Sequence, residues 1–311
     1  MNVAMLTIVA TLAAIPIAFV AIRIATLLLK ARPHATPYVR ATIAFLRGVT
    51  PVFGALIVSV GVVLPAFVRF EPPHDGEQVG FALLALAAVG AAQILWVAFR
   101  LVRILHVSRA ITTAWRQHGH TLSSSHWGLP ALSIDAGFPV VAVSGVLRPT
   151  LFVDSSVLRS CSDPELAAIA AHERAHVRRW DNLCRLLIGA CAGPRSATAA
   201  EWREAAEQAA DQSAAGTASQ RLDLASALLK VTRLAPVRSF EATALSTILD
   251  GNALETRIRR LLAGPTEAPN TFAHRVAAAA SISVATLAAL NWNALLSSTH
   301  AVVETAVKHL R

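Results

Sequence analysis

The chain has 311 residues, of which 54% are hydrophobic and only 15% are charged, and its formal net charge is +9. Soluble domains ordinarily carry about 25% charged residues, so this composition excludes an ordinary soluble globule and favours a membrane protein. The positive charge by itself also suits nucleic-acid binding. However, the chain contains a single tyrosine, Tyr38, and no alternation of aromatic with basic residues. We therefore expect no direct binding of nucleic acid.

Four stretches are apolar and close to the roughly 20 residues that a helix needs to cross a bilayer core. They run from about residue 3 to 29, 48 to 68, 79 to 99 and 276 to 296. The first lacks the basic start of a secretory signal peptide, so we expect it to be retained. The fourth is rich in alanine and contains Asn291 and Asn293, which leaves a buried soluble helix as its alternative.

The connections between these stretches differ in charge. The short connection 71–77 is acidic, whereas basic residues follow the first and third stretches: Lys30, Arg32, Arg40, Arg47, Arg100, Arg103, Arg109 and Arg116. Positively charged loops remain in the cytoplasm. We therefore expect a multi-pass protein of the cell (inner) membrane. Its three helices with short loops occupy 1–100, a cytoplasmic domain occupies 101–275, and a fourth helix with a short extracytoplasmic tail occupies 276–311.

The first part of the cytoplasmic region has the composition of β-strands. Phe138–Ser144 and Thr150–Asp154 are rich in β-branched residues, and Gly145–Pro149 between them is rich in turn-forming residues. From Ser162 onward the pattern is helical. The fold class predicted is a mainly α membrane protein with an α+β domain inserted between its third and fourth spans, and 138–144 is a candidate edge strand of that domain.

A helix is predicted to begin at Ser162, whose hydroxyl can cap it. Pro164 suits the first helical turn, and Glu165 completes a capping-box pattern. The same helix carries the sequence His-Glu-Arg-Ala-His over residues 172–176. Residues four apart lie on one face of a helix, with about 5–6 Å between their Cβ atoms. Both imidazoles can therefore bind one ion, and the adjacent Glu173 can reach a water on it.

A catalytic zinc site uses three protein ligands, so a third ligand is needed. The predicted helix 199–215 offers four carboxylates: Glu201, Glu204, Glu207 and Asp211. Glu207 and Asp211 share one face, which suits Glu207 as ligand and Asp211 as acceptor for an imidazole N–H. Glu204 is the alternative ligand. A solvated helix face produces the same histidine spacing by chance in about one such chain in a hundred, but the capped helix and the acidic helix downstream favour metal binding.

With these residues in place, the chain resembles the BlaR/MecR-type antirepressor metalloproteases, which are membrane gluzincins. The matching segments are Val146-Leu147-Arg148-Pro149, Asp163-Pro164-Glu165-Leu166, His172 through Asn182, Glu207 through Asp211, and Leu254 through Ile258. The plan of three spans, a protease domain and a fourth span is also similar. The resemblance covers nearly the whole chain.

The resemblance implies a gluzincin-type zinc metalloprotease with Zn²⁺ as cofactor. It implies these roles: His172, His176 and Glu207 as zinc ligands, Glu173 as catalytic base, and Asp211 and Asp181 as supporting residues. For Asp181 a solvent-exposed helix end is the alternative. The implied substrate is a cytoplasmic protein or peptide, such as a transcriptional repressor cleaved in signal transduction.

Two features depart from this family. Only residues 297–311 follow the fourth stretch, so we expect no penicillin-binding sensor domain and no β-lactam receptor role. Many gluzincins hold the oxyanion with a Tyr or His, but Tyr38 lies in a distant loop. His120 and His126 are substitutes, with ordinary surface histidines as the alternative. The missing donor keeps open a second hypothesis, a catalytically silent scaffold that retains the zinc fold.

Overall fold

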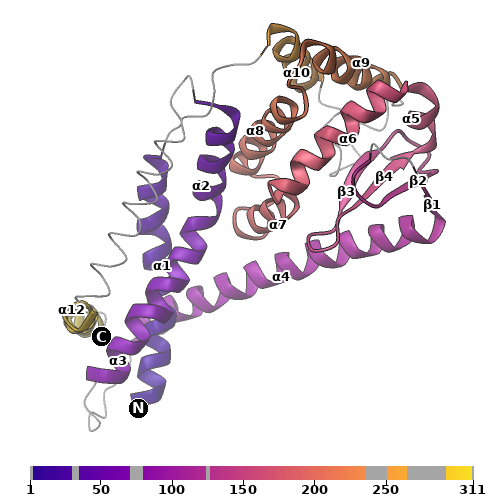
Figure 1. Cartoon of the computed structure of the whole chain (residues 1–311). Coiled ribbons are helices and arrows are strands. Elements are labelled where there is room, and N and C mark those ends of the chain that lie inside the picture. The colour runs from indigo at the N-terminus through magenta and orange to yellow at the C-terminus, as the bar shows by residue number, and fades with distance from the viewer. Residues whose placement is uncertain are drawn as a thin grey trace. The chain divides into compact units, whose positions relative to one another are not determined.

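The computed structural model covers the whole chain and describes residues 3–29, 35–70, 80–123, 127–234, 251–264 and 292–309. The described part is mainly helical, with one small sheet (Figure 1). Its contacts divide the chain into two compact units. The first unit comprises residues 1–30, 46–99 and 268–311, and the second comprises 31–45 and 100–267. The division falls within helices α2 and α4, so each of them contributes residues to both units.

The helices that contribute to the first unit are α1 (Val3–Leu27), α2 (Pro37–Val58), the π-helix η1 (Ser59–Val63), α3 (Leu64–Phe70), α4 (Phe81–His118) and α12 (Trp292–His309). Three helical segments are long and apolar enough to cross a membrane, namely Ala4–Leu27, Pro37–Phe70 and Phe81–His118. The second and third are longer than predicted, because basic residues at the ends of an apolar stretch do not interrupt a helix. The predicted fourth stretch lies outside the described residues up to 291, and the acidic connection 71–77 lies entirely outside them.

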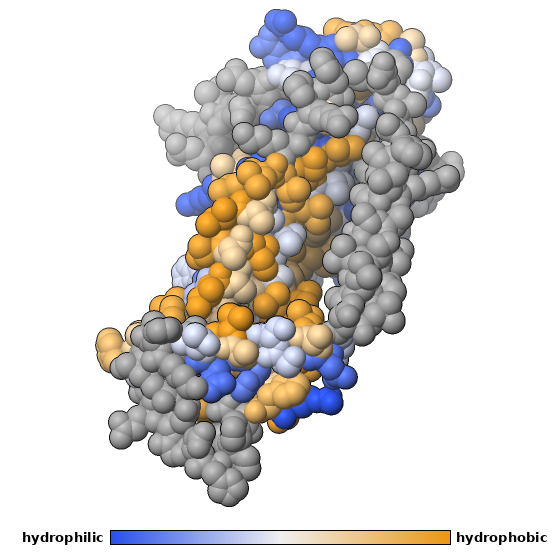
Figure 2. Space-filling view, turned by 90° about the vertical axis from the view of Figure 1, so that its left-hand side faces the viewer, coloured by the Kyte–Doolittle hydropathy of each residue, from blue (hydrophilic) through white to orange (hydrophobic). Residues whose placement is uncertain are grey.

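Large apolar side chains cover the outer surface of these helices. Figure 2 shows a broad hydrophobic surface on one face. Exposed large apolar residues of these helices include Ile17, Ile24 and Ile57. Near the end of the apolar part of α4, Trp96 and Phe99 stack with ring centroids 5.7 Å apart, and both are about half exposed. Soluble proteins rarely leave so large an apolar surface uncovered. The surface therefore suits contact with lipid chains, with aromatic rings at its border.

Close packing in the first unit depends on a glycine opposite a proline. Pro16 lies inside α1 and has no N–H, so it cannot donate the usual helical hydrogen bond to the carbonyl of Leu12. Gly90 of α4 packs against that carbonyl, and a Cβ on Gly90 would lie 2.0 Å from the Leu12 oxygen. Small residues permit such close helix approach in membranes. Only glycine therefore fits at position 90 without moving one of the two helices.

We expect Gly90→Ala to lower the free energy of unfolding by about 1–3 kcal/mol, because the added methyl group overlaps the Leu12 carbonyl. Thermal unfolding of the purified chain in detergent measures the change. Gly61→Ala is the matched control, since a Cβ on Gly61 has no neighbour closer than 4.0 Å. Equal melting temperatures for the two variants would contradict the packing argument.

The second unit contains a four-stranded sheet. Its strands are β1 (His120–Thr121), β2 (Ala131–Ile134), β3 (Val141–Ser144) and β4 (Thr150–Asp154), in the order β1-β2-β4-β3. β2 runs parallel to β4, whereas β1 and β3 run antiparallel to their neighbours. The predicted strand at 150–154 and the edge position of 138–144 are confirmed. β3 begins three residues later than predicted, and Pro139 lies in the excluded part because it cannot donate a ladder hydrogen bond.

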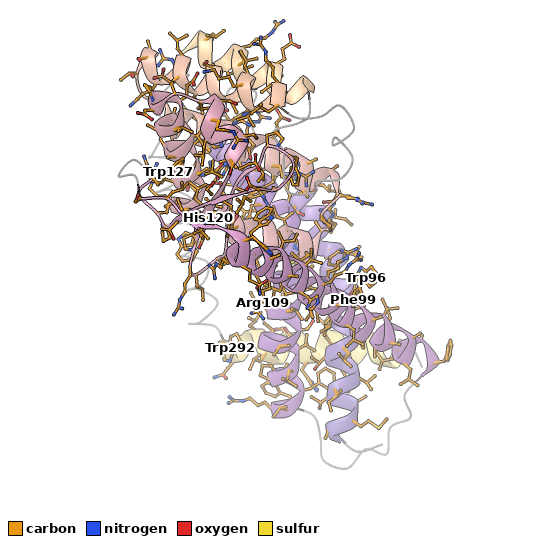
Figure 3. All side chains as sticks on the ribbon, turned by 90° about the vertical axis from the view of Figure 1, so that its right-hand side faces the viewer. Trp96, Phe99, Arg109, His120, Trp127 and Trp292 are labelled. Carbon is orange, nitrogen blue, oxygen red and sulfur yellow. The ribbon has the colours of Figure 1, made fainter. Side chains whose placement is uncertain are left out.

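Besides parts of α2 and α4, the second unit contains these helices: α5 (Ser155–Ser160), α6 (Asp163–Arg178), α7 (Asp181–Cys191), α8 (Ala197–Ala214), α9 (Ala218–Leu234) and α10 (Gly251–Ala263). Leu151 and Val153 of β4 pack in one hydrophobic core with Ile169 of α6 and Val231 of α9. Trp127 is buried in that core (Figure 3). Its carbonyl accepts a hydrogen bond from Arg174 of α6 at 3.0 Å, so α6 is fixed to the sheet by both apolar and polar contacts.

The predicted capping box at the start of α6 is present. Glu165 Oε2 accepts a hydrogen bond from the backbone N–H of Ser162 at 2.7 Å. The same carboxylate accepts hydrogen bonds from Ser226 at 2.6 Å and from Lys230 at 2.7 Å, both on α9. These partners hold the pKa of Glu165 at about 2 although burial opposes its charge. One carboxylate therefore caps the N-terminus of α6 and anchors this helix to α9.

Candidate metal centre

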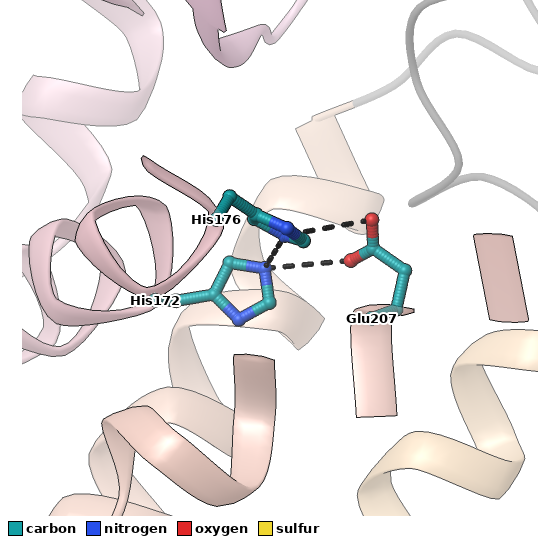
Figure 4. A group of neighbouring side chains, drawn as sticks. All are labelled: His172, His176 and Glu207. Carbon is teal, nitrogen blue, oxygen red and sulfur yellow. Dashed lines mark hydrogen bonds and ion pairs between the residues drawn. The ribbon is translucent and has the colours of Figure 1, made fainter. Parts of the chain in front are cut away.

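Three side chains from two helices meet beside α6 (Figure 4). His172 and His176 lie one turn apart on α6, with 3.0 Å between their Nε2 atoms. Glu207 reaches them from α8. One of its oxygens lies 3.4 Å from His172 Nε2 and the other lies 3.6 Å from His176 Nε2. The structure thus brings together the three residues that the sequence suggested as ligands.

These separations are those expected around a tetrahedral metal ion. With metal–ligand bonds of about 2.0–2.1 Å, neighbouring ligand atoms of a tetrahedron lie about 3.3 Å apart. The two Nε2 atoms lie 3.0 Å apart, the nearest Glu207 oxygen to each of them is a different one, at 3.4 and 3.6 Å, and one ligand atom from each residue lies within 4.8 Å of the others. The group can therefore close on one cation with only small adjustments.

Two carboxylates orient the imidazoles. His176 Nδ1 lies 2.6 Å from Asp181 Oδ2, and His172 Nδ1 lies 3.0 Å from Asp211 Oδ1. His176 Nδ1 is hydrogen-bonded to Asp181, whereas Asp211 lies within ion-pair distance of His172 Nδ1 without hydrogen-bond geometry. A carboxylate beside each Nδ1 favours a proton on that nitrogen, which leaves the Nε2 atoms to face Glu207. Two lone pairs and a carboxylate repel one another unless a cation lies between them. Asp181 and Asp211 thus favour the imidazole tautomers that bind metal.

The structure decides two alternatives that the sequence left open: whether Asp181 is exposed to solvent, and whether Glu204 is the third ligand. Asp181 is only 3% exposed, so its interpretation as a solvated helix end is wrong. Glu204 lies outside the ligand group. Its side chain is half exposed, and it accepts a hydrogen bond from Gln208 at 2.8 Å and pairs with Arg40 at 3.7 Å. Glu207 is therefore the carboxylate of α8 that reaches the histidines.

Two arginines that the sequence pattern did not identify balance the negative charge of the buried carboxylates. Arg257 of α10 is 4% exposed and donates two hydrogen bonds to Asp211, at 2.8 and 2.7 Å. Its Nη1 lies 3.1 Å from Glu207. Arg179 lies 3.4 Å from Asp181 and donates a hydrogen bond to the carbonyl of Ala206 at 2.9 Å. Both arginines occur in segments matched to the family, but only the tertiary structure shows which acids they contact.

The pKa values show that the site stabilises positive charge. Burial alone would lower the pKa of His176, but the charge of Glu207 and the hydrogen bond to Asp181 raise it to about 10. The pKa of His172 is also raised, because Asp211 and Glu207 outweigh the effect of burial. The pKa of Glu207 is well below its usual range, because His176 and Arg257 outweigh burial. Protons therefore compete with a metal ion for the imidazoles.

Glu173, the predicted base, is buried next to this group with 7% of its surface exposed. Burial is the main cause that raises its pKa, and the charge of Glu207 acts in the same direction. Arg185 of α7 acts on Glu173 in the opposite direction. The Nε of Arg185 is buried and has no hydrogen-bond partner among the described residues. A carboxyl group with a raised pKa beside a metal site suits proton transfer near neutral pH.

Of the residues considered for the oxyanion, Tyr38 and His120 are not part of the ligand group. Tyr38 is 48% exposed in the first turn of α2. His120 is exposed on the short strand β1 (Figure 3), and His126 lies outside the described residues. The described structure therefore supports the surface interpretation for His120.

Comparison with known proteins adds no assignment. No model of a protein family matches the chain, and no curated protein matches it significantly. What the geometry defines is a buried group of two imidazoles and one carboxylate that can hold a metal ion, in a chain with three helices able to cross a membrane.

We expect the purified full chain to bind one divalent ion and Glu207→Gln to lose it, because the neutral amide is a poor ligand. Asp181→Asn should weaken binding by about 10–100-fold through the orientation of His176. Metal content after dialysis, measured by mass spectrometry, tests both. Glu204→Gln is the control on the same helix and should retain the ion. Loss of metal from Glu204→Gln alone would reassign the third ligand.

Metal affinity should fall as the pH falls. Because the pKa of metal-free His176 is about 10, its imidazole carries a proton throughout the range pH 6–8, and the ion must displace that proton. Each displaced proton changes the apparent affinity by about tenfold per pH unit. Calorimetry in buffers of different ionisation enthalpy measures proton release directly. An affinity that does not change between pH 6 and pH 8 would show that metal binding displaces no proton from His176.

Proposed function

We propose that this protein is a membrane-embedded zinc endopeptidase. The observation that supports the proposal most is the convergence of His172, His176 and Glu207 with mutual distances of 3.0–3.6 Å, beside the buried Glu173. Two imidazoles and one carboxylate with one open position are the donor set of catalytic zinc. The resemblance to BlaR/MecR-type metalloproteases points to the same chemistry.

The residues around the site fit peptide-bond hydrolysis. Zinc held there would polarise a scissile carbonyl and lower the pKa of a bound water toward about 7. Glu173 accepts a proton from the attacking water and delivers it to the leaving amine. Asp181 and Asp211 keep both imidazoles in the ligand tautomer during this cycle. Arg257 holds Glu207 and Asp211 ionised.

The edge strand β3 offers a surface for an extended peptide. Val140 accepts a ladder hydrogen bond from Asp154 at 2.8 Å, so by alternation the backbone groups of Val141 and Val143 face the open edge. Asn182, just after the metal-binding helix, donates hydrogen bonds to the carbonyls of Val143 at 3.1 Å and Gly145 at 3.0 Å. Asn182 thus fixes the edge strand relative to the site, and pairing with Val141 extends the sheet by β-augmentation.

A shallow cleft of about 220 Å³, partly open to solvent, lies between His176 and Gly145, the residue that follows β3. It is lined by His176 and by mostly apolar side chains: Val146, Pro149, Val177, Trp180 and Leu183. Trp180 has a left-handed backbone conformation, with φ 57°, at the turn between α6 and α7. A peptide on β3 therefore has an apolar cleft beside the scissile bond.

The position of the site relative to the bilayer comes from loop charge. The basic residues that follow the first and third apolar stretches favour a cytoplasmic second unit in the cell (inner) membrane. A cytoplasmic or juxtamembrane regulatory protein is then the substrate, and the resemblance indicates a transcriptional repressor. On this proposal the enzyme acts in signal transduction as an antirepressor.

Glu173→Gln should retain the metal ion but lower cleavage by at least about 100-fold, because the neutral amide cannot accept the water's proton. The assay co-expresses the chain with regulators encoded beside its gene and follows their cleavage by immunoblot. Glu204→Gln, which lies outside the ligand group, is the matched control. Unchanged cleavage by a metal-loaded Glu173→Gln protein would remove Glu173 as base.

The same variant separates the enzyme from a catalytically silent scaffold. A scaffold that only needs the zinc fold keeps its signalling output when Glu173 is replaced, because the ligands are intact. An enzyme loses signalling together with cleavage. Reporter transcription in cells that carry Glu173→Gln therefore decides between the two hypotheses.

A further inference from the structure

A second cavity lies in the second unit, bordered by α8, which carries Asp211, by the start of α9, and by α10, which carries Arg257. It encloses about 590 Å³, part of it open to solvent. Its charged lining consists of three arginines, Arg221, Arg257 and Arg260, and one carboxylate, Asp211. The rest of the lining is uncharged and includes Gln208, Gln212, Ala215, Gly216 and Gly264. The cavity is therefore markedly basic.

The three guanidinium groups are unequally neutralised. Arg257 is saturated on one edge by Asp211, and its buried Nη1 has an ion pair with Glu207 but no hydrogen bond within the described residues. Arg221 makes one long hydrogen bond, 3.5 Å, to the carbonyl of Gly216. Arg260 has no ion pair with any residue that the structure describes. The lining thus has unused donors and excess positive charge.

Neighbouring charge makes this excess larger. Burial and the positive charge of Arg40 lower the pKa of Arg260, and the negative charge of Glu204 opposes them only in part. Helix α9 begins at Ala218, next to Gly216 of the lining, so the positive end of its dipole borders the cavity. Gly264, which follows α10, has φ +89° and no side chain, so no side chain at this position narrows the cavity. Mutually repelling cations around a hollow are stabilised by an anion within it.

We propose that this cavity binds a phosphate group through Arg221, Arg257 and Arg260. Guanidinium groups present planar pairs of N–H donors that match two phosphate oxygens at once. Asp211 occupies the Nε–Nη2 edge of Arg257, so Arg257 adds fixed positive charge to the cavity, while Arg221 and Arg260 offer donors that are less engaged. The phosphate is either a free anion or the headgroup of a phospholipid, since both present the same oxygens. This site shares Asp211 and Arg257 with the metal centre, but phosphate binding here does not depend on peptidase activity.

The experiment titrates inorganic phosphate into the purified full chain in detergent and follows its melting temperature, which rises as a ligand binds the folded state. We expect Arg260→Gln and Arg221→Gln each to weaken the apparent affinity by about tenfold, the effect of one charge-assisted contact. Arg259→Gln is the matched control. Arg259 lies on the same helix, is 78% exposed in its side chain, pairs with Glu255 and does not line the cavity.

A parallel arm distinguishes the two sources of phosphate. The chain is reconstituted in bilayers of phosphatidylcholine alone or with phosphatidic acid added, and the melting temperatures are compared. Stabilisation by phosphatidic acid that Arg260→Gln removes identifies a headgroup, and stabilisation by inorganic phosphate alone identifies a soluble anion.

Three results would overturn the proposal. One is equal stabilisation by sodium chloride at matched ionic strength. Another is phosphate binding that chelation of the metal removes but Arg260→Gln leaves intact, because the anion then binds at the metal centre. The third is an identical response of Arg259→Gln and Arg260→Gln. Circular dichroism of each variant confirms that the comparison is made between folded proteins.

Discussion

The compensation of buried negative charge is the constraint on which the second unit depends. Glu173, Asp181, Glu207 and Asp211 are each less than 8% exposed and surround one pair of imidazoles. Ionised carboxylates are tolerated inside a protein only when cations or hydrogen-bond donors neutralise them. Arg257 and Arg179 supply part of that charge. A cation held by His172, His176 and Glu207 would supply more, so the carboxylates that define the site also favour a bound metal ion.

The surrounding fold serves to hold α6 and α8 at the correct distance. α6 is anchored to α9 through Glu165 and Lys230, and to the connection between β1 and β2 through Arg174. Arg179 joins the end of α6 to the backbone of α8 at Ala206, next to Glu207. These contacts are short, partly buried and directional, which makes them suited to fix positions. The position of Glu207 relative to the histidines is thus determined by polar links on both sides of the site.

Local features of the fold and site could be predicted because they depend on residues close in the chain. The capping box needs only Ser162 and Glu165, and the convergence of His172 and His176 needs only helical periodicity. The edge strand was predictable from β-branched composition, except that its start moved past Pro139. Among the acids of α8, Glu207 could be favoured over Glu204 because it shares a face with Asp211 at a spacing of four residues.

The sequence by itself determined that the chain has long apolar helices, where α6 begins, and that its two histidines can share one ion, since these properties follow from composition and from the period of a helix. Only the tertiary structure decided that Asp181 is buried against His176, that Arg257 reaches Asp211 from 46 residues away, and that three arginines border one cavity. Contacts between separate helices depend on how those helices pack, and no local pattern encodes the distance between side chains that meet only after folding.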